Sequence, residues 1–146
     1  MSDNQKHFLT SEDEQGVIDA IKQAEHNTSG EIRVHLEKKA KKEAFDRAKE
    51  VFELLEMHQT ELRNGVLIYV AIEDKAFAIC GDKGINEVVS KDFWNSTKDI
   101  MQSHFKKGEF KQGLIEGIIK AGEQLKTYFP YKKNDVNELP DEISKG

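Results

Sequence analysis

An unbroken apolar run of seven residues, 66–72 (VLIYVAI), constrains the fold more than any other feature of the sequence. Gly65 precedes this run, and the polar turn formed by residues 73–75 follows it. A membrane helix needs roughly 18 apolar residues, so the run is far too short to span a bilayer. Successive side chains of a strand point to opposite faces, so a strand that is apolar throughout must be covered on both faces. The run therefore predicts the central strand of a sheet with helices on both sides.

Residues 31–37 show a second strand pattern, in which apolar and polar side chains alternate strictly. Ile32, Val34 and Leu36 would lie on one face, which predicts a strand with a single apolar side. The other face would carry Glu31, Arg33, His35 and Glu37. We interpret this polar face, including His35, as the exposed side of an edge strand rather than as a site.

The spacing of the strands predicts how they pair. Residues 76–80 form a short apolar strand only a turn after residue 72, so these two strands form an antiparallel hairpin. A helical stripe from about residue 41 to about residue 57 separates the strands at 31–37 and 66–72. A helix between two strands favours a right-handed crossover, which makes those strands parallel.

Further helices are predicted from capping residues and helical spacing. Ser11 with Glu14 forms a capping box at the start of the first helix. Ser90 is the expected cap of a later helix, and one helical turn precedes it at 85–89. A last helix runs from Phe110 to about residue 129, and its glycines, Gly113 and Gly117, permit close helix packing inside the chain or against a partner.

These elements predict an α/β fold, a three-layer α/β/α sandwich with a small mixed central sheet of three or four strands. A chain of 146 residues suits one domain. We expect a flexible N-terminus at residues 1–9 and a single domain at residues 10–130. Residues 131–146 form a polar, acidic tail without periodicity, which a metal ion would order.

Composition narrows the classes of function. The chain has 22 Lys and Arg against 27 Asp and Glu, a net charge of −5, and its basic clusters are short. A nucleic-acid binder usually carries a basic excess or a basic face, so no nucleic-acid partner is expected. The polar N-terminus has no secretion signal, and the single cysteine, Cys80, suits a reducing compartment. We expect a cytoplasmic monomer that does not insert into a membrane.

No motif for a known catalytic mechanism occurs. Residues 81–84 (GDKG) lack the long glycine loop of a phosphate-binding P-loop, and neither a dinucleotide fingerprint nor a His-Glu-x-x-His motif is present. Cys80 is interpreted as a packed core thiol, and His104 as a buried histidine that forms a local hydrogen bond. Catalytic residues are therefore left unassigned.

Oxygen donors at loop junctions point instead to a cation. If the first two strands are parallel and the third returns, the junctions that carry Glu31, Asn64 and Asp82 meet at one end of the sheet. Carboxylate and amide oxygens suit hard cations, so we expect Ca²⁺ or Mg²⁺ there. The tail adds further oxygen donors at Asp135, Asn137, Glu138 and Asp141.

Several runs of residues resemble the TPM domain family, named for a thylakoid lumen phosphatase-like protein, a photosystem II repair protein and a nematode receptor modulator. They are SGEIRV at 29–34, RNGVLIYVA at 63–71 and GDKGI at 81–85. The later runs DFW at 92–94, HFKKGEF at 104–110 and GLIEG at 113–117, with the tail at 134–144, resemble the small bacterial stand-alone form. The resemblance covers about residues 10–130.

The resemblance implies an α/β/α sandwich around a four-stranded sheet, with the fourth strand in the N-terminal segment, residues 59–63 or the tail. It also implies divalent metal binding, with Ca²⁺ known in the family, and a weak acid phosphatase activity in plant members. The family positions that match are Glu31, Asn64 with Gly65, Asp82 and Asp92.

Three functions stay open at this point. The first is a Ca²⁺- or Mg²⁺-binding module whose ordered loops and tail present a metal-modulated surface to an unidentified protein partner. The second is a weak metal-dependent acid phosphatase, with Asp82 or Asp92 as base and Arg33 and Lys83 neutralising the phosphate. The third is an interaction domain that needs no metal.

Overall fold

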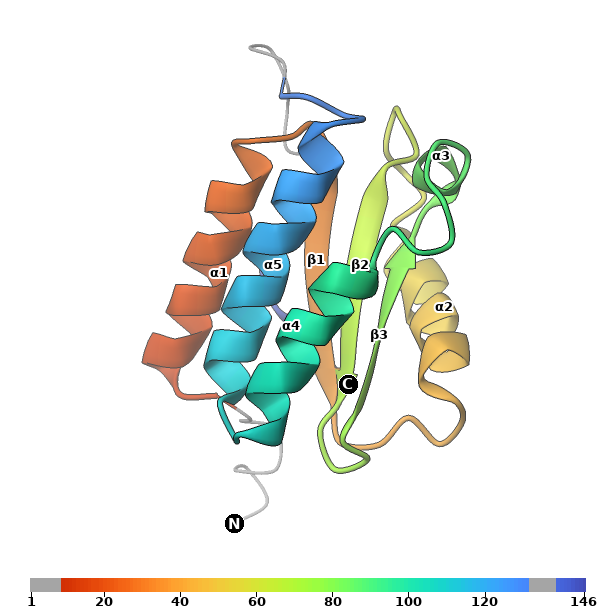
Figure 1. Cartoon of the computed structure of the whole chain (residues 1–146). Coiled ribbons are helices and arrows are strands. Elements are labelled where there is room, and N and C mark those ends of the chain that lie inside the picture. The colour runs from red at the N-terminus through yellow and green to blue at the C-terminus, as the bar shows by residue number, and fades with distance from the viewer. Residues whose placement is uncertain (1–8, 132–138) are drawn as a thin grey trace.

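A mixed sheet at the centre of the chain organises the fold (Figure 1). The computed structural model describes residues 9–131 and 139–146. Along the described chain the elements are α1 (Ser11–Glu25), β1 (Glu31–Glu37), α2 (Ala44–Leu54), β2 (Gly65–Ala71), β3 (Ala76–Gly81), α3 (Lys83–Asn86), α4 (Asn95–Lys106), α5 (Phe110–Lys126) and β4 (Ser144–Lys145).

Within these described ranges, the sheet has four strands in the order β3-β2-β1-β4. Strands β1 and β2 are parallel, with Glu31 opposite Gly65, and β2 and β3 form an antiparallel hairpin. Both pairings agree with the sequence prediction. The fourth strand is β4 in the tail, which pairs in parallel with β1 and places Ser144 opposite His35. The tail pattern showed no periodic element, but the family resemblance named the tail as one of three places for a fourth strand, and the structure selects it.

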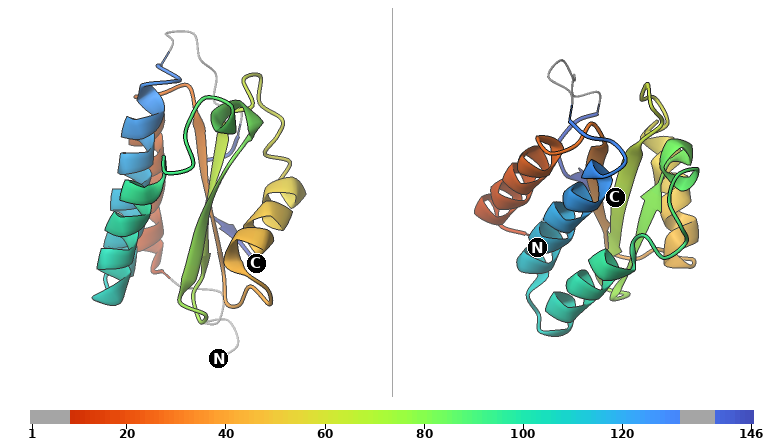
Figure 2. Two further views of the ribbon diagram at one scale, coloured as in Figure 1. Left: turned by 45° about the vertical axis from the view of Figure 1, so that its right-hand side comes forward. Right: turned by 45° about the horizontal axis from the view of Figure 1, so that its top comes forward.

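Helices cover the sheet in two outer layers. Helices α1, α4 and α5 lie on one face and α2 lies on the other, as the left view of Figure 2 shows. Alternate residues of β2 face the two layers: Val66, Ile68 and Val70 belong to the larger core, whereas Leu67 and Tyr69 belong to the core under α2. This double coverage explains the unbroken apolar run and confirms the three-layer sandwich.

Several predicted helix starts are displaced, including the turn predicted at 85–89, which is α3 at Lys83–Asn86. Helix α1 is capped by Thr10 rather than Ser11, because the Thr10 hydroxyl accepts a hydrogen bond from the Asp13 amide at 3.0 Å. Helix α4 begins at Asn95 rather than after Ser90. The intervening turn is held from α5, since the Gln124 side-chain amide donates a hydrogen bond to the Phe93 carbonyl.

Helices α4 and α5 pack closely at two glycines. A Cβ atom at Gly113 would lie 2.5 Å from the Phe105 ring, and one at Gly117 would lie 2.5 Å from Met101. The two glycines therefore serve packing inside the chain. None of the helices in the described part of the chain is long and apolar enough to cross a membrane. The cytoplasmic location and the monomeric state stay predictions.

Candidate functional site

The end of the sheet where β1 and β2 begin brings together the predicted junctions. Glu31 pairs with Gly65, and Val66 pairs with Gly81. The Glu31 amide donates to the Asn64 carbonyl at 3.2 Å, and the Asp82 amide donates to the Gly65 carbonyl at 2.9 Å. Glu31, Asn64 and Asp82 therefore lie at one end of the sheet, as the sequence predicted.

The Asp82 carboxylate is already occupied by protein donors. Nε and Nη2 of Arg63 donate to its two oxygens at 2.8 Å and 3.0 Å. The Lys83 amide also donates to Oδ1 at 2.7 Å, which caps α3. Asp82 is only 5% exposed, so this bidentate pair satisfies a buried charge.

The side chains of Asn64 and Glu31 do not share the hydrogen-bond partners of Asp82. The side-chain amide of the buried Asn64 donates to the Ser29 carbonyl at 3.3 Å. Oε1 of Glu31 accepts a hydrogen bond from the Leu139 amide of the tail at 3.1 Å. Strand β2 lies between β1 and β3, so Glu31 and Asp82 are separated by two strand spacings, about 10 Å. The side chains at this end thus form two groups rather than one.

A carboxylate cluster forms around Glu31. Glu25, the last residue of α1, accepts a hydrogen bond from the Ile32 amide at 2.9 Å through Oε2. Its side chain is also hydrogen-bonded to Asp141 of the tail. Burial, this bond to Asp141 and the charge of Glu31 together raise the pKa of Glu25 to about 9. Glu25 therefore keeps a proton at neutral pH, because the cluster places several carboxylates in a partly desolvated space.

The sequence indicated Asp141 as a tail donor but missed Glu25. Glu25 occupies an ordinary polar position in the helical pattern of residues 11–25, so nothing in the sequence distinguishes it. Only the pairing of the tail with β1 brings Asp141 to the end of α1.

The remaining predicted metal ligands are Asp92 and three residues of the tail. Asp92 is exposed, and its Oδ1 lies 3.5 Å from Nδ2 of Asn95. Asp135, Asn137 and Glu138 lie outside the described residues. Among residues 9–131 and 139–146, no three His, Cys, Asp or Glu side chains are arranged so that they could hold a metal ion. The ligand set and the cation stay predictions.

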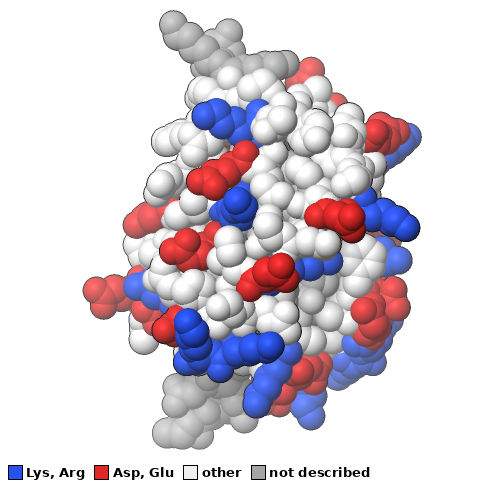
Figure 3. Space-filling model, in the orientation of Figure 1, with Lys and Arg blue, Asp and Glu red and all other residues white. Residues whose placement is uncertain are grey.

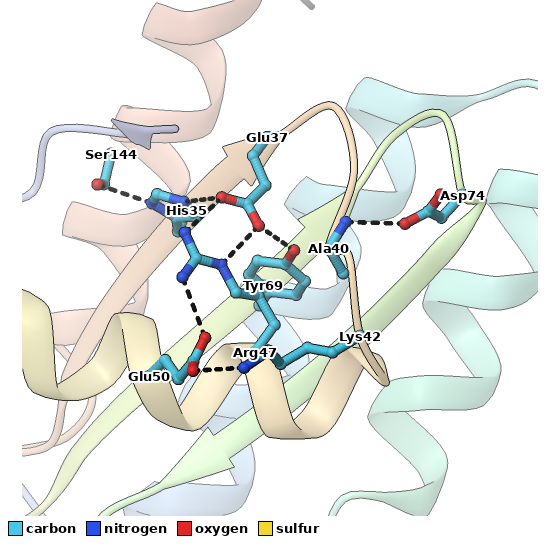
Figure 4. A network of polar contacts seen from close by, with 9 residues as sticks. All are labelled: His35, Glu37, Ala40, Lys42, Arg47, Glu50, Tyr69, Asp74 and Ser144. Atoms are coloured by element: carbon cyan, nitrogen blue, oxygen red, sulfur yellow. Dashed lines mark hydrogen bonds and ion pairs between the residues drawn. The ribbon is translucent and has the colours of Figure 1, made fainter.

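The polar face of β1 carries a second network at the opposite end of the strand (Figure 4). The Glu37 carboxylate accepts hydrogen bonds from Arg47 of α2 and from the Tyr69 hydroxyl. It also lies 3.1 Å from Nε2 of His35, and Nδ1 of His35 lies 2.9 Å from the Ser144 hydroxyl. Because His35 and Glu37 are about 5% and 4% exposed, the expectation of an open edge strand was wrong.

The charges of this second network are mutually compensated. Burial alone would raise the pKa of Glu37, but the hydrogen bonds from Arg47, Tyr69 and His35 outweigh it and lower the pKa to about 2. Burial lowers the pKa of His35 and so favours its neutral form. Since a carboxylate only accepts, Nε2 of His35 donates to Glu37, and Nδ1 accepts from Ser144. The hydrogen bonds of this network connect β1 to α2 and to the tail and stabilise their packing.

The tail connects the two clusters by running alongside β1. Among its described residues, the amide of the buried Leu139 donates to Glu31, and the Gly146 amide donates to the Leu36 carbonyl at 2.9 Å. Lys145 also forms an ion pair with Glu14 of α1 at 2.5 Å. Residues 139–146 therefore contact β1 near its start, at Glu31, and pair with it near its end, at His35 and Leu36.

A surface hollow of about 590 Å³ lies beside Asp82. Arg63, Lys83, Lys49 and His58 contribute basic groups to its lining. Cys80 also lines it, but burial raises the pKa of this thiol to about 11. The thiol therefore stays protonated at neutral pH, in agreement with a packed core cysteine.

Comparison with known families decides the identity of the fold. The profile of the TPM domain matches residues 2–124, most of the chain. The chain belongs to the TPM domain family. The BA42 protein of the psychrophilic bacterium Bizionia argentinensis is similar to this TPM domain, with 61% sequence identity and a TM-score of 0.91. The match covers 96% of this chain and 97% of the BA42 chain.

A distant relative shares only the fold. The N-terminal domain of the cg2496 protein from Corynebacterium glutamicum aligns with a TM-score of 0.64 at 9% identity, over 95% of this chain and 80% of that domain. No curated protein matches the sequence significantly. The comparisons therefore establish the family and the fold.

Proposed function

We propose that this TPM domain binds Ca²⁺ or Mg²⁺ at the end of the sheet where Glu25, Glu31 and Asp141 meet. The described side chains alone form no metal site there, so the proposal requires further ligands from the tail. The observation that carries the proposal is the meeting of these carboxylates: Glu25 is hydrogen-bonded to Asp141, and the tail amide of Leu139 donates to Glu31. Burial beside Asp141 and Glu31 also raises the pKa of Glu25 to about 9, so that Glu25 keeps its proton. A divalent cation in the same place would take over the role of that proton. It would also neutralise the repulsion between the carboxylates more completely than one proton does.

The chemistry of the donors suits a hard cation. All three side chains offer oxygen, which Ca²⁺ and Mg²⁺ prefer. In this proposal, further ligands come from Asp135, Asn137 and Glu138, which precede the docked residues of the tail. Asn64 and Asp82 support the end of the sheet, because Arg63 already compensates the charge of Asp82.

The proposed ion would regulate a surface rather than a reaction. It would bridge the end of α1, the start of β1 and the tail, three segments that are far apart in the sequence. Ion binding would therefore stabilise the tail against β1 and alter the surface available to a protein partner. We accordingly propose a metal-modulated interaction module.

Calorimetry of EDTA-stripped protein, titrated with CaCl₂ and then with MgCl₂, tests this proposal. We expect saturable binding, and we expect Asp141→Asn to weaken it by at least about tenfold, since a charged ligand is lost. Asp99→Asn, on the exposed surface of α4, is a matched control that should leave the affinity unchanged. Absence of binding, or equal affinity in Asp141→Asn and wild type, would contradict the proposal.

Proton release provides an independent readout. If the cation replaces the proton on Glu25, binding at pH 7 must release about one proton per ion. Titrations in buffers of different ionisation enthalpy measure that number. Ca²⁺ binding without proton release would place the ion elsewhere, and Asp82→Asn would then show whether it lies at the other group of side chains.

Hydrolysis of phosphate esters is a second candidate function. The hollow of about 590 Å³ beside Asp82 favours it through Lys49 and Lys83, because cations stabilise a bound phosphate. Glu53 and Glu87 also line this hollow, and Arg63 is already paired with Asp82. Arg33, which was expected to assist, does not line this hollow. A chromogenic phosphate ester with and without Mg²⁺ tests the activity. Turnover that persists at the wild-type rate in Asp82→Asn would exclude this hollow as its site.

A further inference from the structure

A hollow between α4 and the β2–β3 hairpin has the composition of a small-molecule site. Its volume is about 460 Å³. Ligand pockets typically measure roughly 300–1,000 Å³ and combine apolar walls with a few polar groups. The apolar lining consists of Val70, Ile72, Phe77, Phe105 and Phe110. The hollow lies on the opposite face of the sheet from α2 and is distinct from the carboxylate cluster.

Three aromatic rings form one wall of this hollow. Phe77 of β3 packs edge-to-face against Phe105 of α4, with ring centroids 5.4 Å apart. Phe105 also contacts Phe110 of α5 with the same centroid distance. Each ring is only partly buried, so part of its surface is open to a ligand. Mutual packing holds the rings in place and preorganises the wall.

The hollow exists because α4 packs against α5 rather than on the strands. Gly113 and Gly117 remove the side chains that would hold the two helices apart, and Phe105 and Met101 fill the space. This close packing draws α4 toward α5. The apolar side chains of the hairpin, Ile72 and Phe77 among them, are then left without a complete helical cover.

The polar groups of the hollow are cationic. Lys75 of the hairpin turn and Lys106 at the end of α4 line it, and within the described residues no carboxylate does so. Neither lysine forms an ion pair with a described residue. Figure 3 shows Lys and Arg side chains gathered at the lower end of this face, over the end of α4 and the hairpin turn.

We infer that this hollow binds an anionic amphiphile, a carboxylate with an apolar chain of medium length. The chain would lie against Phe77, Phe105 and Phe110, and the carboxylate would lie between the ammonium groups of Lys75 and Lys106. Burial of the apolar chain supplies affinity, and the two positive charges select an anion over a cation.

Decanoate is the probe that tests this inference, used with the full ¹⁵N-labelled chain. We expect saturable amide shifts at Ala76, Gln102 and Phe105, both in EDTA and in CaCl₂. Decylammonium, with the same chain and the opposite charge, should bind at least about tenfold more weakly. Similar affinities for the two amphiphiles, or shifts that centre elsewhere, would overturn the proposal.

Two kinds of variant distinguish the contribution of the lysine charges to decanoate affinity from that of the apolar wall. Lys75→Gln combined with Lys106→Gln should weaken decanoate binding about fivefold, because exposed charges contribute modestly. The double variant Lys91→Gln and Lys126→Gln changes two equally exposed lysines away from the hollow and should bind as wild type. Gln102→Trp places an indole at the exposed rim and should reduce binding. Unchanged affinity in the Lys75 and Lys106 double variant would refute the inference.

Discussion

Arg47 and Glu37 join helix α2 to strand β1 through a bidentate pair, with Nε to Oε2 at 2.9 Å and Nη2 to Oε1 at 3.1 Å. The Glu37 side chain is 6% exposed and the Arg47 side chain is 26% exposed. The pair is therefore largely withdrawn from water, and each partner depends on the other for compensation of its charge.

Removal of Arg47 should destabilise the protein by leaving a buried carboxylate uncompensated. We expect Arg47→Gln to lower the free energy of unfolding by about 2 kcal/mol, measured by urea denaturation. Arg47→Lys should recover only part of the loss, since an ammonium cannot reproduce the bidentate geometry. The double variant with Glu37→Gln should cost less than the two single changes together, and strict additivity would contradict the coupling.

The metal-free protein should become less stable as the pH rises from about 4.5 to about 9. The ordinary pKa of a glutamate is 4.5 and that of Glu25 in the folded chain is about 9, so the folded state holds a proton that the unfolded state releases in this window. The free energy of unfolding then falls by up to about 1.4 kcal/mol per pH unit.

Glu25→Gln should flatten this dependence, because the amide resembles the protonated acid. Glu12→Gln, on the exposed first turn of α1, is the matched control and should leave the slope unchanged. Urea denaturation in EDTA at pH 5, 7 and 9 measures the free energy of unfolding of each variant and so its dependence on pH. A wild-type slope retained in Glu25→Gln would show that another group is responsible.

Acid should destabilise the protein through the network at Glu37. Its folded pKa of about 2 is below the ordinary value of 4.5, so its contribution is complete above pH 4.5 and is lost as the pH falls toward 2. Neutral His35, whose pKa is also lowered, adds a loss that starts below pH 6.5. Glu25 opposes the His35 loss above pH 4.5, so thermal unfolding between pH 7 and pH 2 is measured in the Glu25→Gln background, which should show both losses. Addition of Glu37→Gln should remove the lower one.

Gly84 should not tolerate a side chain. A Cβ atom there would lie 2.2 Å from the Leu62 carbonyl oxygen and 2.6 Å from that of Arg63, both of which are backbone. Gly84→Ala should therefore lower stability by about 2 kcal/mol. Gly16→Ala is the contrasting variant, since its Cβ would meet no backbone: the nearest atom belongs to the flexible Lys111 side chain, at 3.1 Å, and Ile115 lies at an ordinary contact distance of 3.8 Å. That change should be neutral or stabilise α1 by about 0.5 kcal/mol, and chemical denaturation distinguishes the two.

The sequence predicted the elements whose signal is local. The apolar run at 66–72 identified the central strand, the alternation at 31–37 identified its parallel neighbour, and helical spacing located the main helices. It also predicted that Glu31, Asn64 and Asp82 lie at one end of the sheet, because strand direction alone decides this.

The partners of individual side chains depend on tertiary packing. Nothing local indicates that Arg63 compensates Asp82, or that Arg47 covers the polar face of β1. Helix ends were displaced by a residue or more because caps such as Thr10 compete with equally suitable neighbours.

The tail shows most clearly which features depend on local sequence and which depend on tertiary contacts. Its composition predicted a polar segment rich in oxygen donors, and two of its described residues, Ser144 and Lys145, form a strand. Its placement depends on the free edge of β1, which supplies backbone partners, and on the buried position of Leu139. Local sequence patterns were enough to specify which segments form strands and helices, because those patterns repeat over neighbouring residues. The meeting of Asp141 with Glu25 followed from the folded chain alone, because their contact depends on a strand pairing between segments distant in the sequence.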